Sequence, residues 1–262
     1  MDAAVIKKSN GKIEVLPDLE ALSLRAASTF VSASKNSIAT RKRFGVAISG
    51  GSTPRRLYML LGSDAYHHQV DWQHVHLFWA DERCVPKEDE ASNFRAAYDP
   101  LLSKVALPDK NIHRIKGEEV PDKAARDYEE EIRNFFGESE KPRFDLIILG
   151  MGEDGHTASL FPGSKSLEEK VRLAIPVYLA EPKKNRITLT LPVLNNADQI
   201  LFLVAGRSKA TVLSEVLGDE GKKEGFPAGM IRPTDGNTIW LIDQEAAGKL
   251  EGVDSPQRRG GR

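Results

Sequence analysis

The sequence has 262 residues, of which 40% are hydrophobic and 29% are charged, an ordinary composition for a water-soluble globular protein. Its 37 Lys and Arg residues nearly balance 38 Asp and Glu residues, which argues against a general nucleic-acid-binding protein. A single cysteine, Cys84, excludes an internal disulfide and a cysteine-based zinc cluster. No apolar run reaches the ~18 residues that span a bilayer, and the start turns polar too soon for a secretory signal. We therefore expect a cytoplasmic protein that binds neither nucleic acid nor membrane.

The first elements expected along the chain are a hairpin and a helix. Apolar segments at 3–6 and 12–16 flank Ser9-Asn10-Gly11, a turn signal that predicts a small β-hairpin. Residues 18–39 are rich in Ala, Leu and Ser with helical spacing, and they predict a helix.

The rest of the chain alternates short apolar runs with helical stretches. The predicted strands are the apolar runs 44–49, 75–80, 144–149, 173–178, 187–191, 200–205 and 238–242. The predicted helices are 54–61, 91–104, 122–136, 207–217 and 243–250. This alternation indicates one α/β domain, residues 1–254, built on a mostly parallel sheet covered on both faces. Residues 255–262 (SPQRRGGR) are expected to form a disordered tail.

Open parallel sheets bind ligands beyond the carboxyl ends of their strands, so the segments after the apolar runs are the candidate sites. The first is the turn SGGSTP, residues 49–54, which we call the glycine turn. Its two glycines allow close approach to a ligand, Thr53 can cap the following helix, and Pro54 suits the first helical turn. Exposed amides and hydroxyls at a helix start predict an anion site at Gly50, Gly51, Ser52 and Thr53. The alternative is a turn that only connects a strand to a helix.

The second candidate is Asp81-Glu82-Arg83, which follows the apolar run HVHLFWA. Two carboxylates and a guanidinium at a strand end are typical of a polar binding site, but they also suit a surface ion-pair cluster. The position beyond an apolar strand favours the site.

The third candidate is the segment GMGEDGHT, residues 150–157, which follows the apolar run FDLIIL. It has the spacing G-x-G-x-x-G, but a dinucleotide site needs a long helix next, and Pro162 limits any helix there to a few residues. The better candidate is His156 as a general base, since the positive end of a short helix would keep its imidazole neutral. A structural histidine is the alternative.

The remaining candidates are cations and possible metal ligands. Arg207 and Lys209 open a predicted helix after the run ILFLVA, where two cations could hold a substrate anion, and Arg186 opens the run RITLTL. The alternative is a solvated helix start. His74 and His76 share a strand face without a third ligand nearby, so we expect no metal. Arg83 could lower the pKa of the Cys84 thiol, but no base is adjacent in sequence, and Cys84 is expected to pack.

Together these segments resemble the glucosamine-6-phosphate isomerase/6-phosphogluconolactonase family. The matching stretches are AISGGSTPRRLY, LFWADERCVPKEDEASNFR, FDLIILGMGEDGHTASLFPGS, RITLTLPVLNNADQILFLVAGRSKA and PAGMIRP, in the family's order between residues 47 and 233. The resemblance implies a three-layer α/β/α fold with a Rossmann-like, mostly parallel sheet. It also implies hydrolysis of 6-phospho-D-glucono-1,5-lactone, in the oxidative pentose phosphate pathway, without a metal or organic cofactor. The expected partner is therefore a sugar phosphate lactone, bound by a monomer or weak homo-oligomer.

A compatible mechanism assigns roles to the candidate residues. His156 would take a proton from water and return it to the leaving alkoxide, and Arg83 would stabilise the oxyanion or orient the substrate. Asp81 and Asp154 would orient His156 or bind sugar hydroxyls. The 6-phosphate would lie at the glycine turn, with Arg186, Arg207 and Lys209 as counter-charges.

Two alternatives remain from the sequence: a glucosamine-6-phosphate deaminase/isomerase and a non-catalytic sugar-phosphate-binding protein. The deaminases resemble GHIAFNEP after the histidine, with a glutamate five positions on, whereas this chain reads GHTASLFP and has Phe161 there. They also carry a tyrosine at the position of Arg83. Both differences favour lactone hydrolysis over deamination, and the presence of His156 and Arg83 argues against a binding protein without catalysis.

Overall fold

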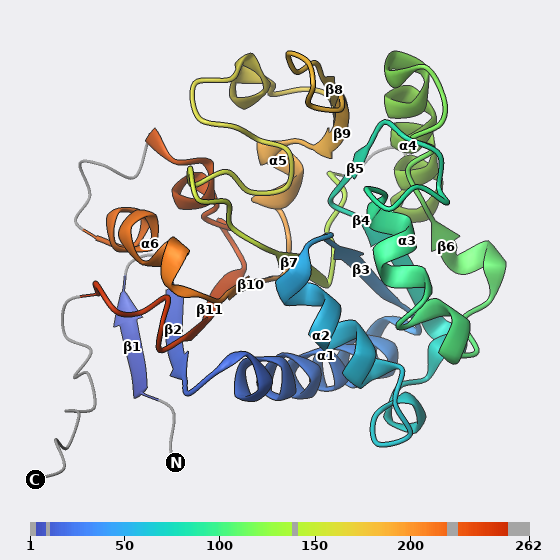
Figure 1. The fold of residues 1–262 in the computed structure, drawn as a ribbon. Helices are drawn as coiled ribbons and strands as arrows, with labels where there is room; N and C mark the ends of the chain where they lie inside the picture. The colour runs from blue at the N-terminus through green and yellow to red at the C-terminus, as the bar shows by residue number, and fades with distance from the viewer. Residues whose placement is uncertain (1–3, 9–10, 138–140, 219–224, 251–262) are drawn as a thin grey trace, which may run out of the picture.

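A computed structural model describes residues 4–8, 11–137, 141–218 and 225–250 (Figure 1). The predicted hairpin is present, since β1 (Ala4–Lys8) and β2 (Gly11–Leu16) pair antiparallel. The predicted helix follows as α1 (Leu19–Arg41), whose first turn is capped by the Asp18 carboxylate accepting from the amide of Ala21. The tail predicted at 255–262 lies outside the described residues.

The central sheet has eight strands in the order β1-β2-β11-β10-β7-β3-β4-β6. Its other strands are β3 (Phe44–Ile48), β4 (Val75–Trp79), β6 (Ile112–His113), β7 (Leu146–Leu149), β10 (Gln199–Val204) and β11 (Asn237–Asp243). Every neighbouring pair apart from β1 and β2 is parallel, which confirms the predicted α/β class and mostly parallel sheet.

Helices cover both faces of this sheet, as two consecutive residues of β3 show. The ring of Phe44 packs edge-on against Phe30 of α1, at 5.3 Å between centroids. A Cβ on Gly45 would lie 2.9 Å from the ring of Phe135, in α4 (Pro121–Phe136). Successive strand residues face opposite sides, so α1 and α4 cover opposite faces and the fold has three layers. Figure 1 shows α2 (Ser52–Leu61) beside α1, and the two helices contact one another.

Three strands form a second, antiparallel sheet in the order β5-β9-β8, and here the sequence analysis was wrong. Two of the predicted parallel strands belong to it, as β8 (Ala174–Val177) and β9 (Arg186–Leu189). The third is β5 (Asp81–Arg83), which lies just beyond the strand predicted at 75–80 and pairs with β9. Its polar side chains carry no local strand signal, because the pairing partner is about a hundred residues away in sequence.

Several predicted helices have different bounds. The helix expected at 91–104 is α3 (Asn93–Tyr98) and a 3-10 turn (Leu102–Lys104), with Pro100, which has no amide hydrogen, between them. The helix expected at 207–217 is a 3-10 turn (Arg207–Lys209) and α6 (Ala210–Val216). No helix forms at 243–250, where the chain continues from β11 as turns. The remaining short elements are α5 (Leu191–Leu194) and 3-10 turns at His67–Gln69, Trp72–His74, Asp109–Asn111, Lys165–Glu168 and Pro227–Met230.

The strand order places the candidate segments together. From β3 the chain proceeds to β4 on one side of the sheet, whereas β7, β10 and β11 lie on the other side. The topological switch point is therefore between β3 and β7, where open α/β sheets bind their ligands. The glycine turn follows β3, and the segment with His156 follows β7.

Candidate active site

A cavity of about 230 Å³ lies at this switch point. Four of the segments singled out in the sequence line it together, although they are up to 160 positions apart in the chain. The predicted site residues in its lining are Gly50, Gly51, Ser52, Thr53, Asp81, Arg83, His156 and Lys209. Asp154, Arg186 and Arg207 are outside that lining.

The glycine turn supplies an uncapped helix N-terminus to the cavity. Gly51, at φ 112°, is the N-cap of α2, so the expected capping by Thr53 is wrong, while Pro54 does lie in the first turn. No side chain bonds to the first amides of α2, and its first turn has no acidic residue. These amides and the positive end of the helix are thus left available for an anion.

His156 is held in one orientation by three contacts. Its Nδ1 lies 2.5 Å from Oδ1 of Asp154, which also accepts from the His156 amide at 3.1 Å. Phe161 packs against the ring at 4.8 Å between centroids. A Cβ on Gly152 would lie 2.1 Å from Nδ1, so the ring needs glycine beneath it. Because an ionised carboxylate only accepts, Nδ1 carries the hydrogen and Nε2 keeps the lone pair of the neutral ring.

The pKa of Asp154 supports this assignment. Partial burial favours the neutral acid, but the hydrogen bonds from the amide and ring of His156 outweigh it and lower the pKa below its usual value. Asp154 is therefore an anion at neutral pH. The expected helix after His156 is absent, since residues 157–164 form turns, so the argument from a helix dipole in this segment was wrong. Asp154 orients the imidazole instead.

The side chains of Asp81 and Glu82 are buried, and each accepts hydrogen bonds that connect β5 to other segments. The buried carboxylate of Asp81 accepts from Ser159 Oγ at 2.7 Å and from Asn93 Nδ2 at 3.1 Å, which joins β5 to the segment after His156. Glu82 accepts from the amides of Asn93 and Phe94 at the start of α3. Burial raises the pKa of Glu82, although these amides partly oppose it. Within the described residues neither carboxylate forms an ion pair with Arg83, which speaks against a surface ion-pair cluster.

Arg83 and Arg186 are directly opposed in the β5·β9 pair. The Nε of each guanidinium is buried and without a hydrogen-bond partner. Burial and the charge of Arg83 lower the pKa of Arg186. Like charges directly across two strands are destabilising, so an anion near Arg83 would stabilise the pair. Burial also raises the pKa of the neighbouring Cys84 to about 11, which is contrary to the expected effect of Arg83 and consistent with packing.

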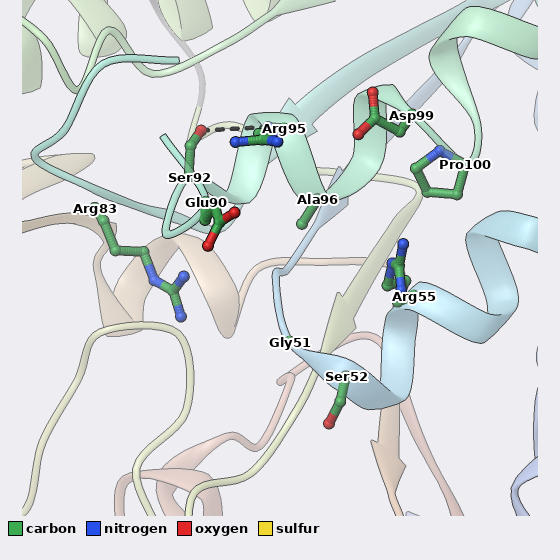
Figure 2. A pocket seen from close by; sticks show the side chains of 10 residues that line it. All are labelled: Gly51, Ser52, Arg55, Arg83, Glu90, Ser92, Arg95, Ala96, Asp99 and Pro100. Atoms are coloured by element: carbon green, nitrogen blue, oxygen red, sulfur yellow. Dashed lines mark hydrogen bonds between the residues drawn. The ribbon is translucent and has the colours of Figure 1, made fainter. Parts of the chain in front are cut away.

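The two cations after β10 have different positions. Lys209 is half-buried and lines the cavity, whereas Arg207 is exposed and does not. An adjoining cavity has a volume of about 330 Å³ and shares Gly51, Ser52 and Arg83 with the first. Its lining side chains are drawn in Figure 2. Arg55 of α2 and Arg95 of α3 line it, so the region around the α2 N-terminus is rich in guanidinium groups.

Sequence reasoning missed Asn93 and gave no role to Ser49 of the glycine turn, and both line the cavity. Asn93 Nδ2 donates to the backbone and side-chain oxygens of Asp81, and its Oδ1 lies where a Cβ of Gly50 would be, at 1.8 Å. The pair Ser92-Asn93, a helix-start signal, could have identified it. Among the described residues no cluster of His, Cys, Asp and Glu could hold a metal ion. In the same part of the chain no helix is long and apolar enough to cross a membrane.

The fold and site define an α/β protein with an anion-binding cavity and a histidine placed for proton transfer, and comparison with known proteins supplies the family. The model of the glucosamine-6-phosphate isomerases/6-phosphogluconolactonase family matches residues 17–240, and the chain belongs to this family. It is 38% identical to the 6-phosphogluconolactonase of Synechocystis over 242 residues, covering 91% of this chain and 98% of the relative. The structure of the Thermotoga maritima 6-phosphogluconolactonase is 31% identical with a TM-score of 0.76, covering 88% and 99%. A monomeric glucosamine-6-phosphate deaminase shares the fold, with a TM-score of 0.75 at 21% identity over 90% and 99%.

Proposed function

We propose that this protein hydrolyses 6-phospho-D-glucono-1,5-lactone to 6-phospho-D-gluconate, as the second step of the oxidative pentose phosphate pathway. One observation carries the proposal: His156 and Arg83 line the same cavity, and Asp154, which is outside that lining, is bonded to Nδ1 of the imidazole, so that Nε2 is left to act as the base. This is a general base beside a cation, which is what the addition of water to a lactone carbonyl requires. The names of the relatives at 31–38% identity support the same reaction.

In the first step, Nε2 of His156 accepts a proton from water as its oxygen adds to C1 of the lactone. The carbonyl oxygen becomes an alkoxide, which Arg83 stabilises. The imidazolium formed on His156 is stabilised by the Asp154 carboxylate. In the second step the C1–O bond to the ring oxygen breaks, and His156 returns its proton to that oxygen. The product is the open-chain acid, which ionises in water, and the enzyme is unchanged.

The phosphate is proposed to lie at the glycine turn, against the first amides of α2 and the ammonium of Lys209. The support is the uncapped N-terminus of α2 and the position of Lys209 in the lining. Arg186 is proposed to attract the substrate anion through its charge beside Arg83. Arg207, which is exposed in the turn before α6, is a further candidate for phosphate binding. Asp81 is proposed to position the His156 segment through Ser159.

Deamination of glucosamine 6-phosphate is disfavoured by one side chain. The residue against the imidazole is Phe161, which has no group that accepts or donates a proton. Proton shuttling during sugar-ring opening would need such a group, whereas a lactone is already closed and activated at its carbonyl.

The test is to assay the purified protein with both the phosphorylated lactone and glucosamine 6-phosphate. Lactone freshly generated from glucose 6-phosphate is followed by acid release at constant pH, with the spontaneous rate subtracted, and glucosamine 6-phosphate is followed by ammonia release. We expect accelerated lactone opening and no ammonia. Ammonia without acceleration of lactone opening would refute the proposal.

The setting of this activity is also a proposal. We infer a cytoplasmic enzyme that acts on a small sugar phosphate without nucleic acid, as a monomer or weak homo-oligomer with one domain over residues 1–254. The supporting observations are the balanced charge and the single cysteine.

A further inference from the structure

Ala158 has a backbone conformation that is unusual for a residue with a side chain. Its φ is 47°, in the left-handed region, where Cβ of an L-residue crowds the backbone and glycine does not. It lies in a tight turn that is closed by the amide of Leu160 donating to the carbonyl of Thr157 at 2.9 Å. Tight turns with positive φ favour Gly, Asn or Asp, and alanine is none of these.

Glycine is used freely in the same segment, at Gly155 with φ 78° and at Gly163 with φ 67°. In the described part of the chain, one other non-glycine residue has positive φ, namely Lys42 at φ 60°. Lys42 ends α1, where the left-handed conformation lets its amide bond to the carbonyl of Ile38, a common helix ending. Ala158 ends no helix. What alanine supplies at this strained position, and glycine would not, is a methyl group.

The surroundings of Ala158 indicate what the methyl group contacts. Ala158 comes two residues after His156, lines the same cavity as Arg83 and Lys209, and is only partly buried, with the rest of its side chain packed against the hydrophobic core. The cavity also has apolar lining from Met151 and from residues 203–205. Ligand cavities commonly combine an apolar wall with a few polar groups that orient the ligand.

We propose that the methyl group of Ala158 is a wall of the substrate cavity that contacts the lactone ring and sets how tightly the ring is held beside His156. The inference rests on the proposed lactone hydrolysis and adds a contact residue to it. A wall of this kind touches the substrate before and during the reaction alike, so it acts on binding rather than on the chemical step.

The test is Ala158→Gly in the full chain, with steady-state kinetics on the phosphorylated lactone and thermal denaturation. Loss of one methyl contact should raise KM about 4–10-fold, while kcat stays within about two-fold of wild type. The melting temperature should be unchanged or higher, because glycine removes the strain at φ 47°. Lys42→Gly is the matched control, since it relieves the same kind of strain outside the cavity lining and should leave KM and kcat unchanged.

Three results would overturn the inference. A lower melting temperature with unchanged KM would show that the methyl group packs against the protein interior. A fall in kcat with unchanged KM would show that Ala158 acts only through the position of His156. Wild-type values of both constants would show that the wall has no effect. Failure of the wild-type chain to accelerate lactone opening would instead refute the proposed function.

Discussion

Asp154→Asn isolates the contribution of the carboxylate that holds His156. The substitution keeps the shape of the side chain and an oxygen that can accept from Nδ1, but it removes the negative charge 2.5 Å from the ring. That charge stabilises the imidazolium formed when His156 takes a proton from water. The side chains are 34% exposed for His156 and 53% for Asp154, so solvent screens the interaction.

A charge-assisted hydrogen bond contributes about 1.5–3 kcal/mol, and the exposure places this one near the lower end. We therefore expect kcat to fall about 10–30-fold with little change in KM. Glu153→Gln is the control, because it removes the same charge from the exposed neighbouring residue. The assay is lactone hydrolysis at constant pH for both variants and wild type. A kcat for Asp154→Asn within two-fold of wild type, or an equal loss for Glu153→Gln, would refute this role.

Three further outcomes are expected. Lys209→Ala should raise KM for the phosphorylated lactone about 10–150-fold and leave unphosphorylated gluconolactone nearly unaffected, because a charged hydrogen bond to phosphate is lost; equal effects on both substrates would contradict phosphate contact. Arg83→Lys should lower kcat ~10–100-fold, since an ammonium cannot reproduce the guanidinium geometry at the oxyanion; full activity would assign Arg83 to the fold alone. Burial and the neighbouring His113 lower the pKa of His76 to about 4. Between about pH 6.5 and 4 the His76 imidazole therefore stays neutral in the folded protein but takes up a proton in the unfolded chain. The free energy of unfolding, measured by urea titration, should thus decrease by on the order of 2 kcal/mol as pH falls from about 6.5 to 4. His76→Gln should make this dependence on pH weaker. The same dependence on pH in His76→Gln and wild type would contradict the prediction.

The gathering of the candidate site residues at one cavity could be predicted from the sequence, because parallel strands place their carboxyl ends at one edge. Apolar runs followed by glycine or charged residues identified the ends of β3, β4, β7 and β10, and these four strands are neighbours in the sheet. His156, Arg83 and Lys209 therefore came together as expected.

The rest depended on contacts between distant segments, which leave no local pattern. The strand Asp81–Arg83 exists because it pairs with β9, and its own residues are polar. Short apolar runs such as 173–178 fit a parallel or an antiparallel strand equally well. Asn93 joined the site through hydrogen bonds to Asp81 that span twelve positions. The orientation of His156 by Asp154 was one of two roles proposed for that carboxylate, and the structure supports this one.

The most direct test of the central claim compares wild type with His156→Ala in lactone hydrolysis, with the spontaneous rate subtracted and circular dichroism showing equal folding. The account predicts that wild type accelerates lactone opening and that the variant loses about 10²–10⁴-fold in kcat, the usual contribution of a general base. A folded His156→Ala variant with activity within a few-fold of wild type would contradict it.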